Sequence, residues 1–124
     1  MPDLINSLDQ VIERINAFNA STNKRIIIGI VGKPGAGKST LTEHILSNLP
    51  KGVATIVPMD GYHLSNSQLA RLGLADRKGA PNTFDSEGYV NLLRRLRNDI
   101  DKDVYFPVFH REIEESYAAD GVVL

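Results

Sequence analysis

The residues most suggestive of chemistry lie at positions 32–39, which read Gly-Lys-Pro-Gly-Ala-Gly-Lys-Ser. This run matches the pattern G-x-x-x-x-G-K-[ST] without a mismatch. Glycines let backbone N–H groups curve around phosphate oxygens, and a helix N-terminus adds a partial positive charge. In this pattern Lys38 reaches the β- and γ-phosphates, and the hydroxyl of Ser39 binds Mg²⁺. The predicted nucleotide-binding residues are Gly32, Lys33, Pro34, Gly35, Ala36, Gly37, Lys38, Ser39 and Thr40.

The segments on either side of the loop fit this prediction. Residues 26–31 (Ile-Ile-Ile-Gly-Ile-Val) form an apolar, mostly β-branched run without polar alternation, typical of a strand covered on both faces. From Lys38 the apolar residues follow a helical spacing, and residues 50–52 (Pro-Lys-Gly) end it. A glycine turn that only joins a strand to a helix is the alternative. A dinucleotide fingerprint is excluded because its third small residue would fall on Thr40.

The sequence also argues against a GTPase. Guanine recognition usually requires Asn-Lys-x-Asp downstream of the loop. The one Asn-Lys pair, Asn23-Lys24, lies upstream of it, with Ile26 in place of the acid. Residues 76–79 (Asp-Arg-Lys-Gly) match a D-x-x-G pattern, but so short a pattern occurs by chance.

Asp60 is the candidate residue for acting on a second reactant. It follows a predicted strand over Val53–Met59 and precedes Gly61. Ligands of open α/β sheets gather at the carboxyl ends of the strands. A carboxylate there could accept a proton from a substrate hydroxyl, orient it, or hold a Mg²⁺-bound water. An ordinary turn aspartate in an Asp-Gly step is the alternative, and the residues alone leave both readings open.

The remaining pattern predicts helices alternating with strands. An amphipathic helix is expected over residues 1–20. A capping box at residues 65–68 starts a helix over Asn66–Leu72, and Asp85 is the expected N-cap of a helix reaching Ile100. Residues 104–109 are expected as an extended edge or loop segment because Pro107 interrupts them.

Residues 122–124 (Val-Val-Leu) read as the opening of another buried strand. The alternation predicts an α/β fold of the P-loop NTPase class, with three α/β/α layers around a mainly parallel sheet.

Composition narrows the class of protein. With 124 residues and a mass of 13.6 kDa the chain has room for one domain, expected over residues 1–124. A net charge of −1 argues against a nucleic-acid partner. The longest apolar run is too short to cross a membrane, and the N-terminus lacks the pattern of a signal peptide, so a cytoplasmic location is expected. The chain has no cysteine and three histidines, which argues against a zinc site.

Four separated motifs carry a resemblance to a known family. They are residues 32–40, 59–64 (Met-Asp-Gly-Tyr-His-Leu), 77–85 (Arg-Lys-Gly-Ala-Pro-Asn-Thr-Phe-Asp) and 106–111 (Phe-Pro-Val-Phe-His-Arg). In order and spacing they resemble the uridine kinase, phosphoribulokinase and bacterial pantothenate kinase group of P-loop kinases, over about residues 25–124. The chain looks most similar to the nucleoside, pantothenate or sugar kinase-like branch.

The resemblance implies a reaction and its cofactors. ATP and Mg²⁺ would serve as cofactors, and a phosphoryl group would pass to a hydroxyl of a small molecule. Asp60 would be the catalytic base, and Lys38 would act on the transferred phosphate.

The same resemblance implies an acceptor pocket. Its candidate residues are Tyr62, His63, Arg77, Lys78, Phe84, Phe109 and Arg111. A solvated basic turn is the alternative for Arg77 and Lys78, and core packing is the alternative for the two phenylalanines. His110 departs from the family, in which aspartate often follows the aromatic residue.

The family pattern continues beyond position 124. The resemblance implies a later acidic residue near Mg²⁺ and an arginine-bearing lid, so the chain is expected to be truncated before the lid. Self-association or a complementing chain is expected to complete the sheet. A non-catalytic ATP-binding module and one part of a split kinase are the alternative functions.

Overall fold

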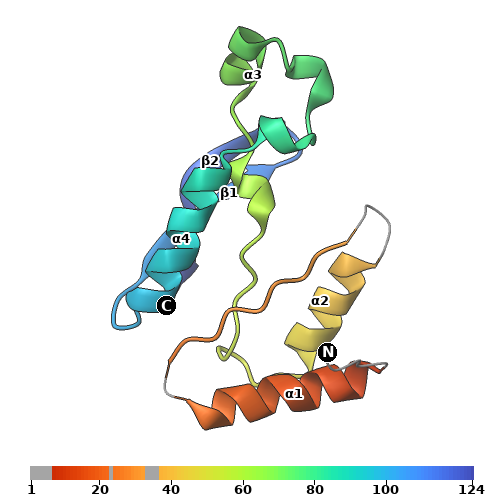
Figure 1. The fold of residues 1–124 in the computed structure, drawn as a ribbon, viewed down its shortest axis with the longest axis vertical. Helices are drawn as coiled ribbons and strands as arrows, with labels where there is room; N and C mark the ends of the chain where they lie inside the picture. The colour runs from red at the N-terminus through yellow and green to blue at the C-terminus, as the bar shows by residue number, and fades with distance from the viewer. Residues whose placement is uncertain (1–6, 23, 33–36) are drawn as a thin grey trace. The chain divides into compact units, whose positions relative to one another are not determined.

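The computed structural model describes residues 7–22, 24–32 and 37–124 (Figure 1). The chain divides into two compact units, Met1–Ile56 and Val57–Leu124. Each unit holds a different part of the predicted site.

The first unit contains two helices that contact each other, α1 (Leu8–Ser21) and α2 (Lys38–Ser47). The hydroxyl oxygen of Ser7 accepts a hydrogen bond from the backbone N–H of Gln10 at 3.2 Å, which caps α1. The N-terminal amphipathic helix is thus confirmed over its described part. α2 confirms the helix predicted after the glycine loop.

The two strands predicted in this region are wrong. Residues 26–31 are irregular, and so are residues 53–58, after which Met59 begins a 3₁₀ turn. Ile28 is 48% exposed and Val31 is 92% exposed, so the apolar run is not covered on both faces. An apolar, β-branched run forms a strand only beside a partner that completes its ladder. In the part of the chain that the structure describes, neither segment pairs in a sheet.

The second unit is built from short helices and a hairpin (Figure 1). Its helical elements are η1 (Met59–Tyr62), α3 (Asn66–Leu72), η2 (Ala75–Arg77), η3 (Pro81–Thr83) and α4 (Ser86–Asn98). The predicted caps are confirmed, because Ser65 accepts a hydrogen bond from the N–H of Gln68 at 3.3 Å and Asp85 accepts one from Gly88 at 3.1 Å. Gly73 ends α3 with φ of 73°, as its role of C-terminal stop requires.

The described sheet is an antiparallel hairpin rather than a parallel sheet. β1 (Val104–His110) pairs with β2 (Glu115–Val123) through a turn over residues 111–114. The register slips between Phe106 and Val108, where Pro107 has no N–H to give to the ladder. Residues 122–123 therefore end β2 instead of opening a central strand. The turn lacks the Gly and Asn signals of a tight hairpin, so local sequence does not reveal the reversal.

The buried hydrophobic side chains of the described residues all lie in this second unit. They are Leu69, Leu92, Leu96, Val104, Phe106 and Val123. α4 lies along the hairpin in Figure 1 and contacts β1. This core fixes the loops that carry the acceptor-side residues. Within the described residues, no helix is long and apolar enough to cross a membrane.

Candidate functional site

The predicted phosphate loop runs directly into α2 in the first unit. Gly37 is the N-cap of α2 with φ of 92°, a left-handed conformation that suits glycine. Lys38, Ser39 and Thr40 form the first turn of the helix, with Ser39 and Thr40 exposed. The predicted binding residues Lys33, Pro34, Gly35 and Ala36 lie outside the described residues. The helix N-terminus presents backbone N–H groups and a hydroxyl that suit phosphate oxygens.

The side chain of Lys38 reaches back to Gly32. Its Nζ donates a hydrogen bond to the carbonyl oxygen of Gly32, six residues earlier. The Lys38 carbonyl accepts a hydrogen bond from the Thr42 hydroxyl at 2.7 Å, which ties the first turn of α2 to the next. The ammonium group therefore lies close to the residue where the loop begins, which is where a cation could bind phosphate charge.

Asp60 lies on η1 in the second unit, and its side chain is exposed. Its main-chain carbonyl accepts two hydrogen bonds from His63, one from the backbone N–H at 3.1 Å and one from ring Nδ1 at 2.7 Å. The next residue, Gly61, is buried. Two hydrogen bonds to one carbonyl oxygen and the burial of Gly61 thus restrain the turn that carries the candidate base.

Two of the four motifs meet at an isolated antiparallel bridge between His63 and Phe84. The N–H of Leu64 donates to the Thr83 carbonyl at 2.8 Å, and the N–H of Asp85 donates to the Tyr62 carbonyl at 2.7 Å. Backbone hydrogen bonds therefore hold the segment after Asp60 against the end of the 77–85 motif, as an acceptor pocket built from both would require.

Three predicted pocket residues form an aromatic cluster. The ring of His63 lies 4.2 Å from that of Phe84 and 4.7 Å from that of Phe109, measured between centroids, with interplanar angles of 40° and 31°. The ammonium of Lys78 lies 5.4 Å from the Phe109 ring centroid, within the range of a cation–π contact. Three separate motifs thus contribute to one cluster next to Asp60.

Lys78 is held by several protein groups. Its Nζ donates to Asn66 Oδ1 at 2.8 Å and to the Glu114 carbonyl at 2.5 Å, and it lies 3.5 Å from the Glu114 carboxylate. The ammonium therefore links its loop to α3 and to the hairpin turn. In a solvated basic turn the Lys78 ammonium would contact water, whereas here it contacts Asn66 and Glu114.

The other predicted pocket residues lie apart from the cluster. The ring of Tyr62 packs on Tyr89 with centroids 5.4 Å apart. Burial raises the pKa of the Tyr62 hydroxyl, and the charge of Asp85 raises it further. Arg77 is exposed at the end of η2, and Arg111 is exposed in the hairpin turn.

His110, the departure from the family pattern, lies between two carboxylates. Its Nε2 lies 2.9 Å from Asp120 Oδ2, and its Nδ1 lies 3.0 Å from Glu112 Oε1. The hydrogen bonds to Asp120 and Glu112, in that order, raise the pKa of the imidazole above its ordinary value. The ring also stacks on Tyr117, with centroids 4.2 Å apart. These contacts join the two strands and their turn.

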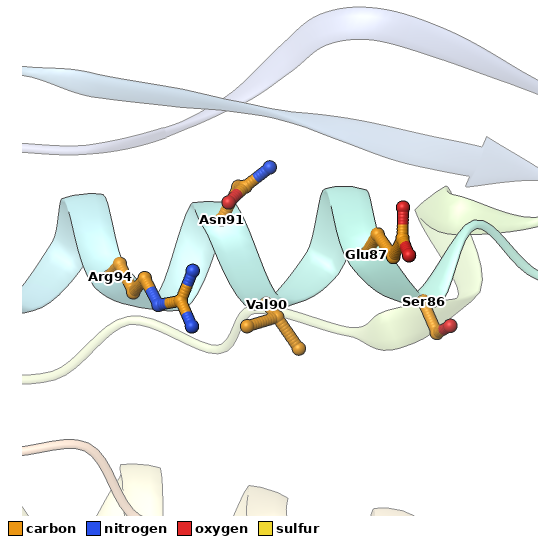
Figure 2. A pocket seen from close by; sticks show the side chains of 5 residues that line it. All are labelled: Ser86, Glu87, Val90, Asn91 and Arg94. Atoms are coloured by element: carbon orange, nitrogen blue, oxygen red, sulfur yellow. The ribbon is translucent and has the colours of Figure 1, made fainter.

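A surface depression on α4 does not coincide with this cluster. Figure 2 shows its five lining side chains on the one helix: Ser86, Glu87, Val90, Asn91 and Arg94. All five residues are exposed, and none belongs to the predicted site. The depression therefore gives no support to a binding function.

Comparison with known proteins finds relatives that cover most of this chain. A Schizosaccharomyces pombe protein named "putative uridine kinase" is 30% identical over 127 residues, covering 96% of this chain and 53% of that protein. A pantothenate kinase of Streptococcus pneumoniae is 35% identical over 98 residues, covering 75% of this chain and 31% of that protein.

A solved structure agrees with these relatives. The crystal structure of a Silicibacter sp. protein described as a "putative fructose transport system kinase" is similar with a TM-score of 0.82 and 34% identity. The match covers 96% of this chain and 58% of the other. This chain is similar to proteins named as a uridine kinase, a pantothenate kinase and a sugar transport kinase. The resemblance predicted from the four motifs is confirmed, and the fold is an α/β kinase fold. No family model matches the chain.

The kinase relatives are longer than this chain, which spans about half of the first and about a third of the second. These relatives are named as kinases, which is the enzyme class that the four motifs predict for this chain. The individual site residues stay predictions.

The sequence analysis did not predict the residues that hold Lys78 and its loop in place. Asn66 and Glu114 bind Lys78, and a carboxylate oxygen of Glu115 accepts a hydrogen bond from the Asn66 N–H at 2.8 Å. Thr83 is fully buried; its hydroxyl donates to the Ala80 carbonyl at 2.6 Å and accepts from the Gly79 N–H at 3.1 Å. Asn66 and Glu115 are 49 positions apart in the sequence, which explains why no local pattern could pair them.

Proposed function

We propose that this chain carries the nucleotide-binding and part of the acceptor-binding region of a P-loop small-molecule kinase. The reaction transfers the γ-phosphoryl group of ATP to a hydroxyl group. The observation that carries the proposal is the complete phosphate-loop pattern running directly into the N-terminus of α2, with Lys38 on its first turn. The kinase names of its relatives support the same reaction class.

The described ends of the phosphate loop fit a nucleotide. Gly37 adopts a left-handed conformation at the helix N-terminus, and the Lys38 ammonium lies beside the first loop residue. The exposed hydroxyl of Ser39 is an oxygen ligand of the kind that Mg²⁺ takes. No cluster of three or more His, Asp or Glu suited to a metal occurs among the described residues. Magnesium in such sites needs few protein ligands, because phosphate oxygens and water supply the rest.

Asp60 is proposed as the general base. ATP would supply the phosphoryl group. Mg²⁺ would offset the negative charge of the phosphate oxygens. The Asp60 carboxylate accepts the proton of the acceptor hydroxyl as the new oxygen–phosphorus bond forms and the bond to the ADP oxygen breaks. Its exposure on η1 leaves the carboxylate accessible to an acceptor.

The acceptor is proposed to be a nucleoside, pantothenate or sugar-like hydroxyl compound. The aromatic cluster of His63, Phe84 and Phe109 offers apolar ring faces beside Asp60. Such faces suit the carbon skeleton of an acceptor, while the carboxylate suits its hydroxyl. Tyr62, Arg77, Lys78 and Arg111 stay as proposed acceptor-side residues.

The test is phosphoryl transfer measured with matched variants. The chain is incubated with Mg²⁺, ATP and uridine, pantothenate or fructose, and phosphorylated product is identified by mass spectrometry. Asp60→Asn keeps the shape of the side chain but cannot accept a proton, so we expect transfer to fall by about 10²–10⁴-fold. Asp76→Asn, an exposed aspartate of η2, is the control and should keep the wild-type rate. ATP binding without product from any acceptor would favour a non-catalytic ATP-binding module.

A further inference from the structure

We infer that His63 is a positioning residue for Asp60, acting through its ring Nδ1–H. The inference rests on the proposed function, because Asp60 matters here as the proposed base. The structure shows His63 in contact with Asp60 through the main chain and not through the carboxylate. This contact gives His63 a role beyond any contact of its ring face with an acceptor.

The hydrogen bond fixes which ring nitrogen carries the proton. Nδ1 of His63 lies 2.7 Å from the main-chain carbonyl oxygen of Asp60. A carbonyl oxygen can only accept a hydrogen bond, so Nδ1 must donate. In the neutral ring Nε2 is then the unprotonated nitrogen.

The same carbonyl oxygen receives a second hydrogen bond from the His63 backbone N–H at 3.1 Å. The backbone bond closes the turn, and the ring bond fixes the orientation of the carbonyl. Since this carbonyl belongs to Asp60 itself, the ring restrains the peptide unit next to the Cα from which the candidate carboxylate projects. Backbone rotation at Asp60 would break the ring bond.

The neighbouring aromatic rings restrict the orientation of the His63 imidazole, so that Nδ1 stays directed at the Asp60 carbonyl. Phe84 and Phe109 both lie within 5 Å of the His63 ring centroid, and the backbone bridge to Phe84 fixes the root of the side chain. A ring restrained in this way loses little further freedom when it makes the hydrogen bond. The geometry of Asp60 is thereby tied to two other motifs of the acceptor side.

The functional consequence follows from the demands of proton transfer. A general base must lie about 2.6–3.2 Å from the proton-bearing oxygen. A misplacement of about 1 Å can cost about 10²-fold in rate. Loss of the ring bond should therefore lower kcat while leaving ATP binding unchanged, because the ring does not belong to the phosphate loop.

Two variants separate the hydrogen bond from ring packing. His63→Asn places a side-chain amide N–H close to the position of Nδ1 and removes the ring. His63→Phe keeps a ring between Phe84 and Phe109 but has no donor. We expect the kcat of His63→Phe to lie about 10–10²-fold below that of His63→Asn, with an unchanged KM for ATP in both. The reverse order of the two variants would overturn the inference.

A measurement independent of turnover uses NMR on the labelled 124-residue chain. The ¹⁵N shifts of the neutral wild-type His63 ring should show a protonated Nδ1 and an unprotonated Nε2. The ¹³C shift of the Asp60 carbonyl should move in His63→Phe and stay near the wild-type value in His63→Asn. The opposite tautomer, or an Asp60 carbonyl unaffected in His63→Phe, would contradict the inference. If wild-type turnover is missing, the proposed function fails by itself, and these shifts still decide whether His63 holds the Asp60 turn.

Discussion

Gly61 packs directly against the backbone of Pro107. A Cβ atom placed on Gly61 would lie 2.1 Å from the Pro107 carbonyl oxygen and 2.7 Å from its carbonyl carbon. The glycine after Asp60 is therefore required by close approach to β1, at the point where Pro107 interrupts the hairpin register. This contact ties the turn bearing the candidate base to the 106–111 motif.

Gly61→Ala should destabilise the second unit, because the backbone it meets cannot move aside as a flexible side chain would. We expect a loss of about 1–3 kcal/mol in the free energy of unfolding, as for other overpacked sites. Urea unfolding followed by circular dichroism measures it. Gly29→Ala is the matched control, since nothing lies within 4 Å of its added Cβ. Equal free energies of unfolding for Gly61→Ala and Gly29→Ala would contradict the prediction that position 61 requires glycine.

Lys78→Met should destabilise the loop that joins α3 to the hairpin turn. The variant keeps much of the apolar stem but removes hydrogen bonds to Asn66 and Glu114. A loss of about 1–3 kcal/mol is expected for hydrogen bonds to a charged group. Arg77→Met removes the same charge from the neighbouring exposed residue and should change the free energy of unfolding by less than about 0.5 kcal/mol. Urea unfolding of both variants tests this, and equal losses would contradict a tethering role for Lys78.

The raised pKa of His110 predicts a specific dependence of stability on pH. The protonated ring is favoured in the folded state by Asp120 first and by Glu112 second. Its contribution is fully present below the ordinary value of 6.5 and is lost as pH rises through the raised pKa. Urea unfolding from about pH 5 to about pH 8 should show the wild type losing more stability than His110→Gln. Asp120→Asn removes the largest cause and should reduce the dependence. Parallel curves for wild type and His110→Gln would contradict this assignment.

Self-association is proposed through the exposed apolar run at residues 26–31. Val31 is 92% exposed and Ile28 is 48% exposed, and exposed apolar surface favours association. Val31→Lys changes an exposed position, so folding should be preserved while a charge opposes contact with a second copy. Sedimentation across a wide concentration range should show a mass that rises for the wild type and stays lower for Val31→Lys. A wild-type monomer at all concentrations would contradict the proposal.

The helices were predictable because their signals are local. The capping residues Ser65 and Asp85 and the stop at Gly73 each act within one turn of the helix they define. Sequence therefore located α3 and the start of α4 closely. The motif at 32–40 was readable for the same reason.

The sheet was not predictable in the same way, because a strand depends on a distant partner. The run at 26–31 has the composition of a buried strand, yet it pairs with no described strand, whereas Glu115–Val123 pairs with β1 despite exposed residues along its middle. The contacts of Lys78 with Glu114 likewise join residues 36 positions apart. The motifs were enough to predict the candidate acceptor-side residues. The residues that hold them in place could be identified only from the folded structure.

The most direct test of the account is calorimetric titration of the chain with ATP in the presence of Mg²⁺. We expect the wild type to bind ATP and Lys38→Ala to bind it clearly more weakly, because that variant removes the cation placed for the β- and γ-phosphates. Lys51→Ala, which removes a lysine outside the phosphate loop, should bind as the wild type does. Equal ATP affinity of the wild type and Lys38→Ala would contradict the central claim that residues 32–40 bind the nucleotide.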